Sequence, residues 1–361
     1  MKITEKIRTR ESYFEGIQVK SKSFIKSSKI SINSIDSFLN QRYETNLEDL
    51  IAEMLDVDDE KRIDTICDIC QSWVNWLSQK GKSPKTVSDY FVFLKLYLHF
   101  RKIKITPQDV KESIHFPAKI KEEKYPLTNS QILEILDTAQ YSKKGLYLAL
   151  LSSGMRIGEL VQITKKDIVT DLQRLMIRIP ARITKTKQGR TTFISKEAAK
   201  FISRKLREIG DDDLVWGKNS DKDSSMHAEE KTFREYLKKI GFHEKYDSGR
   251  LKISPHSFRA FFFTKAARRH DENYAHMMTG HGGYLMQYDR LTDEEKLDMY
   301  LELEPDLLIF DQTKNEEKIR KLKEANIQLA DQAEQLKQQE VRIKQLERSW
   351  LESKHPGIKN L

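Results

Sequence analysis

The sequence predicts a mainly helical protein of the α+β class, and three observations support this expectation. Apolar residues recur at three- and four-residue spacing through most of the 361-residue chain. Only the stretch "LMIRIPARITKTKQGRTTFIS" is typical of strands, with β-forming residues on both sides of a turn rich in Lys and Gly. The length suffices for two ordinary domains and an appendage. We therefore expect a helical domain, a mixed domain with a small antiparallel sheet, and a long C-terminal helix.

The N-terminal third divides into a basic arm and a helical domain. Residues 1–35 are rich in Lys and Ser, so we expect an extended arm that could hold a short helix or strand. Residues 36–118 have helical periodicity throughout and predict a bundle of about four helices. Gly81 closes one of these helices, and Ser83 with Pro84 begins the next as cap and first helical residue.

A Cys-x-x-Cys pair within this domain has the spacing of a metal or redox motif. A zinc site needs two further ligands, and no second pair of cysteines exists in the sequence. The neighbouring apolar residues have helical spacing, which indicates an amphipathic helix. We therefore interpret Cys67 and Cys70 as core residues.

The remainder comprises a linker, a second domain and a tail. Residues 119–126 contain many charges and Pro126 with little apolar periodicity, which is typical of a linker. Residues 127–308 form the mixed domain, whose first helix has Thr128 as its cap. In residues 313–351, apolar residues recur every seven positions and predict a long helix able to form a coiled coil. These heptad residues are Leu322, Leu329, Leu336, Ile343 and Trp350.

The charge balance favours a polyanionic partner. The chain has 64 Lys and Arg against 55 Asp and Glu, a formal net charge of +9. Neutralisation of phosphates supplies most of the non-specific affinity of proteins for nucleic acids. No apolar run approaches the ~20 residues that span a bilayer. The first residues have charges but no apolar signal-peptide core behind them, so we expect a cytoplasmic protein without membrane contact.

Several basic and hydroxyl-bearing residues stand where they could act on one phosphate. Arg156 follows a glycine turn at a helix start in "SSGMRIGEL", and Lys187 lies beside the glycine turn of the predicted hairpin. In "PHSFR", His256 and Arg259 are three residues apart and face the same side of a helix. His281 and Tyr288 follow in the "GHGGYLMQY" stretch.

These residue types suit attack on a phosphodiester. Two arginines can stabilise the charge that develops on the phosphate oxygens without a metal. A tyrosine oxygen can form a covalent phosphate ester, and a lysine can protonate the leaving 5′-oxygen. The metal alternative needs clustered carboxylates, and none stand near these motifs, so we expect no metal and no cofactor.

The order and spacing of these motifs resemble those of the tyrosine recombinases, the family that includes phage integrases. The resemblance covers roughly residues 35–305 and includes "GKSPKTVSDY", which is similar to the helical core-binding domain of that family. It implies a C-shaped clamp around duplex DNA, with a catalytic domain of the tyrosine recombinase type over residues 127–308. It also implies site-specific strand exchange through a 3′-phosphotyrosyl bond, by four protomers on two DNA sites.

The resemblance also assigns roles to individual residues. Arg156 and Arg259 would hold the scissile phosphate, His256 would assist proton transfer, and His281 would contact the phosphate or orient the nucleophile. Lys187 would be the general acid, with Lys185 as the alternative. Glu159 would support the site from behind or be a surface charge.

The nucleophile stays open between two tyrosines. Members of the family usually place it about nine residues after the last histidine, whereas Tyr288 comes seven after His281 and Tyr300 lies on a later helix. We prefer Tyr288 and expect Tyr284 to pack with Leu285. Thr279 stands where the family usually has an apolar residue, and we expect it to affect packing more than chemistry.

Three other functions remain possible on the sequence alone. A type IB topoisomerase uses nearly the same residues without a partner duplex. A DNA-binding architectural protein could have lost the chemistry, and a coiled-coil assembly protein could merely retain the domains. We expect double-stranded DNA at a specific site as the partner, with a further coiled-coil partner possible through the C-terminal helix.

Overall fold

Most of the described helices are directly preceded by a residue whose side chain caps the helix N-terminus. The structure is a computed structural model that describes residues 8–218, 221–281, 291–310, 313, 315, 328–329, 332–346 and 350. It divides into two compact units, Met1–Glu123 and Lys124–Leu361. The described residues are mostly helical, with one three-stranded antiparallel sheet, which confirms the predicted fold class. None of the described helices is long and apolar enough to cross a membrane.

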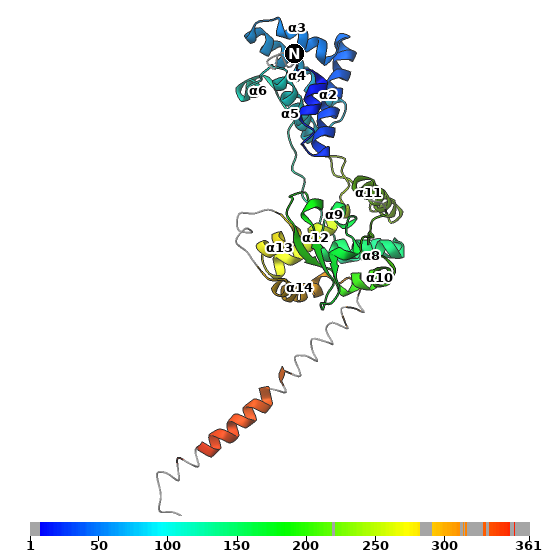
Figure 1. Ribbon diagram of the computed structural model, residues 1–361, viewed down its shortest axis with the longest axis vertical. Helices are drawn as coiled ribbons and strands as arrows, with labels where there is room; N and C mark the ends of the chain where they lie inside the picture. The colour runs from blue at the N-terminus through cyan, green and yellow to red at the C-terminus, as the bar shows by residue number, and fades with distance from the viewer. Residues whose placement is uncertain are drawn as a thin grey trace, which may run out of the picture. The chain divides into compact units, whose positions relative to one another are not determined.

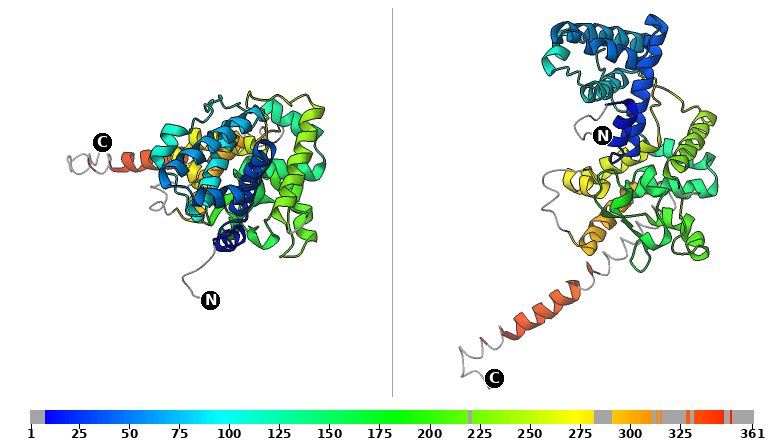
Figure 2. Two further views of the ribbon diagram at one scale, coloured as in Figure 1. Left: turned by 90° about the horizontal axis from the view of Figure 1, so that it is seen from above. Right: turned by 45° about the horizontal axis from the view of Figure 1, so that its top comes forward.

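The first unit is built only of helices in its described part (Figure 1). Side chains of Thr9, Ser21, Asn46, Asp58, Ser83 and Thr106 each accept a backbone N–H of the helix that follows. Figure 2 shows these helices as a bundle from two directions. They are α1 (Arg10–Gly16), α2 (Lys22–Tyr43), α3 (Leu47–Leu55), α4 (Asp59–Gln79), α5 (Pro84–Phe100) and α6 (Pro107–Ser113).

The arm expected over residues 1–35 could hold a short helix, as α1 is, but the expectation of an extended arm is wrong from Lys22 onward. Helix α1 begins at Arg10, and α2 spans Lys22–Tyr43 instead of starting near residue 36. Ile32 and Ile35 lie on one face of α2 and are buried in the core of the first unit. The tertiary contacts of this face outweigh the many Lys and Ser residues, whose side chains mostly lie on the solvent side of the helix.

The core of the first unit is apolar and includes both cysteines. Trp73, Cys67 and Cys70 are buried on α4, and the two thiols are free. Burial, with a smaller contribution from nearby carboxylates, raises the pKa of Cys67 to about 11. The interpretation of the Cys-x-x-Cys pair as core residues is confirmed.

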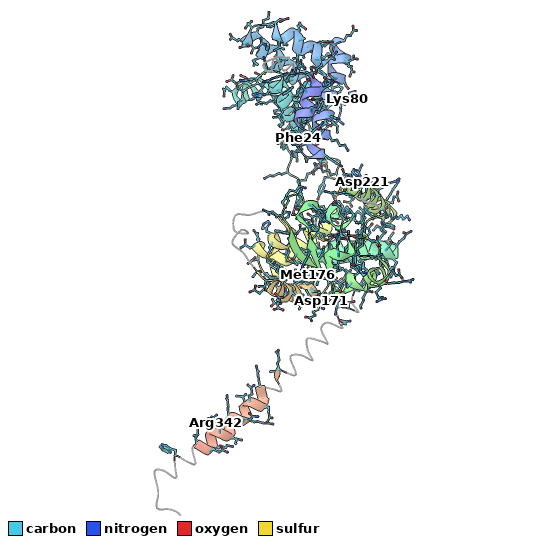
Figure 3. All side chains as sticks on the ribbon, in the orientation of Figure 1. Phe24, Lys80, Asp171, Met176, Asp221 and Arg342 are labelled. Carbon is cyan, nitrogen blue, oxygen red and sulfur yellow. The ribbon has the colours of Figure 1, made fainter. Side chains whose placement is uncertain are left out.

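The second unit wraps helices around a small sheet. Its strands β1 (Ile168–Val169), β2 (Met176–Ile179) and β3 (Arg190–Phe193) pair antiparallel in that order, with Met176 opposite Phe193. Figure 3 labels Met176 at the start of β2. The helices are α7 (Asn129–Thr138), α8 (Tyr141–Ser153), α9 (Ile157–Leu160), α10 (Lys196–Glu208), α11 (Lys222–Lys239), α12 (Pro255–Arg269), α13 (Glu272–Thr279) and α14 (Asp293–Leu307).

Helix α8 is the centre of this second unit. Every residue from Gly145 to Ser153 is buried, and α8 packs against α10 on one side and α12 on another. Gly145 allows the close approach of α10, because a Cβ there would lie 2.9 Å from Cβ of Phe201. The C-terminal end of α8 is therefore fixed in position, and the candidate site begins at that end.

The C-terminal tail is helical over residues 332–346, where Figure 3 labels Arg342. Of the predicted heptad residues, Leu322 lies outside the described residues. Leu329, Leu336, Ile343 and Trp350 are described, and 55–61% of each is exposed. The coiled coil stays a prediction.

Candidate active site

A glycine turn after α8 lets α12 approach closely and aligns its arginine. Gly154 ends α8 in the left-handed conformation, with φ +63°. A Cβ at this position would lie 2.5 Å from the ring of Phe262 on α12, so only glycine permits this packing. The carbonyl of Gly154 accepts a hydrogen bond of 2.6 Å from Nη1 of Arg259. The turn thereby fixes the side chain of the arginine that the sequence predicted for the second motif.

Arg259 and His281 form the centre of the site. Arg259 is 1% exposed, and its Nη2 donates to Nε2 of His281 at 3.0 Å. Burial and the positive charges of Arg156 and Arg190 lower the pKa of Arg259 to about 9. Partial burial and the charges of Arg259 and Arg156 lower the pKa of His281 to about 4. His281 is therefore neutral at pH 7, and Arg259 carries the positive charge.

Glu159 is buried beneath two arginines. Its carboxylate accepts from Nη1 of Arg156 at 2.8 Å and from Nη2 of Arg190 at 2.7 Å. Burial alone would raise the pKa of Glu159, but the hydrogen bonds and charges of Arg190 and Arg156 hold it below its usual value. At 2% exposure Glu159 is not a surface charge, and it orients Arg156 at the start of α9.

Arg190 also belongs to the site, although no motif of the sequence pointed to it. It is the first residue of β3, and its Nε donates to the carbonyl of Met278 at 3.0 Å. A Cβ on Gly280 would lie 2.9 Å from Nη1 of Arg190, and Gly280 has φ +67°. The glycine before His281 therefore allows Arg190 to pack against the end of α13. The only signal in the sequence was an arginine directly after the glycine of the predicted hairpin turn.

His256 lies near the same charges, whereas Lys187 does not bond with them. Partial burial and the charges of Arg259 and Arg156 lower the pKa of His256, which lies in the first turn of α12. Lys187 lies on the connection between β2 and β3, where its Nζ donates to the carbonyl of Arg182 at 3.3 Å. Both Lys187 and Lys185 are exposed on this connection. Lys187 as the general acid, with Lys185 as the alternative, stays a prediction.

Of the two tyrosines predicted as possible nucleophiles, the structure describes only Tyr300. Tyr288 lies outside the described residues, as does Tyr284. Tyr300 is fully buried on α14, its hydroxyl donates to the carbonyl of Ser152 at 2.9 Å, and burial raises its pKa well above the usual value. Its ring also packs against Phe193 of β3. In this structure Tyr300 is a core residue, which counts against it as a nucleophile.

The arrangement is suited to bind an oxyanion. Arg156, Arg190 and Arg259 bring three positive charges, and Glu159 offsets one of them. Nε of Arg259 and Nη1 of Arg190 are buried and have no hydrogen-bond partner in the described part of the chain. Guanidinium groups match the geometry of phosphate oxygens and can donate two hydrogen bonds at once. Among the described residues, no group of three His, Cys, Asp or Glu side chains could hold a metal ion.

Comparisons with known proteins agree with this geometry. Residues 126–294 match the Phage integrase family. A tyrosine recombinase XerC of Chlamydia pneumoniae is 29% identical over 196 residues, which cover 51% of this chain and 59% of that protein. A tyrosine recombinase XerC of Chlamydia caviae (strain ATCC VR-813 / DSM 19441 / 03DC25 / GPIC) is 26% identical over 263 residues, which cover 68% of this chain and 80% of that protein.

A solved structure supports the fold. A lambda integrase dimer bound to a COC' core site has a TM-score of 0.53 and 14% identity, covering 78% of this chain and 97% of that chain. Arg156, Arg259 and His281 all lie in the span that matches the integrase family. The matched sequence and the group of arginines around His281 lead to one family assignment. Residues 126–294 thus match the phage integrases, and the sequence relatives of the chain support the tyrosine recombinase family as its family.

Proposed function

We propose that this chain is a site-specific DNA recombinase that cleaves and rejoins DNA through a 3′-phosphotyrosyl intermediate. The observation that carries the proposal is Arg259, a buried cation whose described hydrogen bonds go to two neutral partners, the Gly154 carbonyl and His281. Its charge is therefore available for an anion that enters the site. On this proposal the protein acts in the cytoplasm, where its DNA substrate would lie.

The cleavage step follows from the chemistry of the side chains. The Tyr288 oxygen attacks the scissile phosphorus, and the bond from phosphorus to the 5′-oxygen breaks. Arg156 and Arg259 stabilise the charge on the non-bridging oxygens, while His256 assists the transfer of the tyrosine proton. Lys187, or Lys185 in its place, protonates the departing 5′-oxygen. A 5′-hydroxyl of the partner duplex then attacks the phosphotyrosine and releases Tyr288.

The identity of the nucleophile can be tested with a nicked suicide duplex. The recombination site is first selected from a pool of random duplexes by its binding to the full chain. Covalent adducts of wild type, Tyr288→Phe and Tyr300→Phe are then separated on a denaturing gel. We expect an adduct from wild type and Tyr300→Phe and none from Tyr288→Phe. Binding without any adduct from wild type would instead favour an architectural DNA-binding protein.

A second assay separates recombination from topoisomerase activity. A recombinase needs two copies of its site, whereas a type IB topoisomerase relaxes a supercoiled plasmid without a partner duplex. We expect joined products only from plasmids with two sites. Relaxation that is equally fast on a plasmid without any site would contradict the recombinase assignment.

We also propose a tetramer on two DNA sites, with the C-terminal helix contributing a coiled-coil contact. The support for the coiled coil is the exposed apolar residues Leu329, Leu336 and Ile343, which recur every seven positions. Sedimentation of the full chain should show self-association that Leu336→Lys with Ile343→Lys weakens. An unchanged mass would argue against a coiled coil of this chain with itself.

A further inference from the structure

Thr279 has an environment that the sequence did not indicate. It is the last residue of α13 and is fully buried directly before Gly280. Its hydroxyl donates to the carbonyl of Ala275, one helical turn earlier, at 2.6 Å. A hydroxyl has one proton and two lone pairs, so after this donation Thr279 can act only as an acceptor. The acceptor side of its oxygen faces His281.

His281 links Arg259 to Thr279 in a chain of hydrogen bonds that all donate in the same direction. Nδ1 of His281 lies 3.2 Å from Oγ1 of Thr279, and Nε2 lies 3.0 Å from Nη2 of Arg259. A guanidinium can only donate, so Nε2 must accept and the proton of the neutral ring must be on Nδ1. The bonds therefore run from Arg259 to His281, from His281 to Thr279, and from Thr279 to Ala275.

The other neighbours of the imidazole are aromatic rings. Phe263 of α12 and His276 of α13 lie with their ring centroids 5.8 and 5.5 Å from that of His281. Both rings are strongly tilted from the plane of His281, at 60° and 70°, and among the described contacts neither ring forms a hydrogen bond with the imidazole. The hydroxyl of Thr279 is therefore the described acceptor for the Nδ1 proton.

We propose that Thr279 is a positioning residue, which holds the His281 ring with its proton on Nδ1 and its Nε2 toward Arg259. The value of this role for DNA cleavage rests on the proposed recombinase function. By holding His281, Thr279 also fixes the plane of the Arg259 guanidinium, whose Nη1 is held by Gly154. An apolar residue at 279 would leave the Nδ1 proton without its acceptor inside the protein.

The first test measures the ¹⁵N resonances of the His281 imidazole by NMR in the full chain without DNA. The protonated and unprotonated nitrogens of a neutral imidazole have well-separated ¹⁵N resonances. We expect His281, assigned through His281→Gln, to have its proton on Nδ1 in wild type and in Thr279→Ser. In Thr279→Val and in the smaller Thr279→Ala, we expect the His281 resonances to shift or broaden.

Thr264 provides a matched control. Its hydroxyl also donates to a carbonyl one helical turn earlier, that of Ala260 at 3.0 Å, but it is exposed on α12. Thr264→Val should leave the His281 resonances unchanged. Unchanged resonances in a folded Thr279→Val or Thr279→Ala variant would overturn the proposal. If Val does not fold, Thr279→Ala decides, since it removes the hydroxyl without adding bulk.

The second test measures adduct formation in a single turnover. We expect Thr279→Val to slow cleavage about tenfold with the DNA dissociation constant unchanged, and Thr279→Ser to restore the rate to within about twofold. Equal rates for wild type and Thr279→Val would overturn the positioning role in catalysis. If wild type makes no adduct at all, the recombinase function fails, while the ¹⁵N resonances still decide the role of Thr279.

Discussion

The two units of this protein bury different kinds of side chain. In the described part of the first unit, the buried polar residues are Ser28 and Ser31, and no charged residue is buried. The second unit buries polar and charged groups throughout its core. Its buried charged residues are Lys143, Glu159, Asp167, Glu197, Glu229, Arg259 and Glu304. Burial of a charge is unfavourable unless the charge has a partner, so the partners of these residues show which charges serve the fold and which are left for a ligand.

The partners of these charges separate structural ion pairs from the candidate site. Lys143 pairs with Glu229, and Glu304 accepts from Arg174 at 2.6 Å while also accepting from the backbone of Lys196. Arg259 differs, because its described hydrogen bonds go to a carbonyl and an imidazole. The buried cation without a carboxylate partner in hydrogen-bond contact is the one that an incoming phosphate could pair with.

The largest expected effect comes from breaking the apolar core of the first unit. Trp73 is fully buried on α4, so Trp73→Ala should lower the free energy of unfolding by about 3–5 kcal/mol. Denaturant unfolding measures this change. The control is Val92→Ala on α5, since Val92 is 52% exposed and its truncation should have little effect. A loss at Trp73 no larger than at Val92 would contradict the placement of Trp73 in the apolar core of the first unit.

Removing the buried cation of the second unit should affect cleavage and stability differently. Arg259→Met should reduce covalent adduct about 100-fold or more, because a charge-stabilising donor is lost. Its free energy of unfolding should stay within about 1 kcal/mol of wild type or rise, because an apolar side chain avoids the desolvation of a charge.

Arg269 offers the matched control on the same helix. Its side chain is 43% exposed and pairs with Asp306, so Arg269→Met should keep the adduct. A large loss of stability in Arg259→Met would show that this arginine serves the fold. Adduct formation that survives Arg259→Met would remove it from the site.

Replacing the buried carboxylate of Glu159 should have an intermediate effect on stability and on adduct formation. Glu159→Gln removes the negative charge that Arg190 and Arg156 share, and we expect a loss of about 1–3 kcal/mol in the free energy of unfolding. Adduct formation should fall as well, since Arg156 loses its orientation. Glu208→Gln, which affects an exposed pair with Arg204, should change neither quantity. Equal behaviour of the two variants would mean that burial of Glu159 has no energetic consequence.

The smallest effect concerns pH. The pKa of His281 is lowered from 6.5 to about 4, so between these values the unfolded chain binds a proton that the folded chain does not. Stability should therefore fall as the pH is lowered from about 6.5 towards 4. Thermal unfolding of wild type and His281→Gln across this window isolates the contribution, because all other groups are shared. Curves that stay parallel would show that His281 titrates normally.

Much of the fold follows from local features of the sequence. Ser83, Pro84 and Thr128 mark helix starts because a capping side chain satisfies N–H groups only one turn away. The arginine and histidine motifs could be recognised because each is a short run of neighbouring residues. Composition predicts the N-terminal arm wrongly, because the single apolar face of α2 packs against partners on later helices.

The tertiary structure alone decided which of these residues act on one another. Arg259 meets Gly154 across 105 positions of sequence, and Arg190 meets Met278 across 88. Tyr300 was the alternative nucleophile on the sequence, and its full burial and its hydrogen bond to Ser152 make it a core residue. Capping and periodicity act within one or two helical turns, so a sequence can indicate them. A hydrogen bond between distant segments depends on how whole helices pack, and that packing placed Thr279, His281 and Arg259 in one chain.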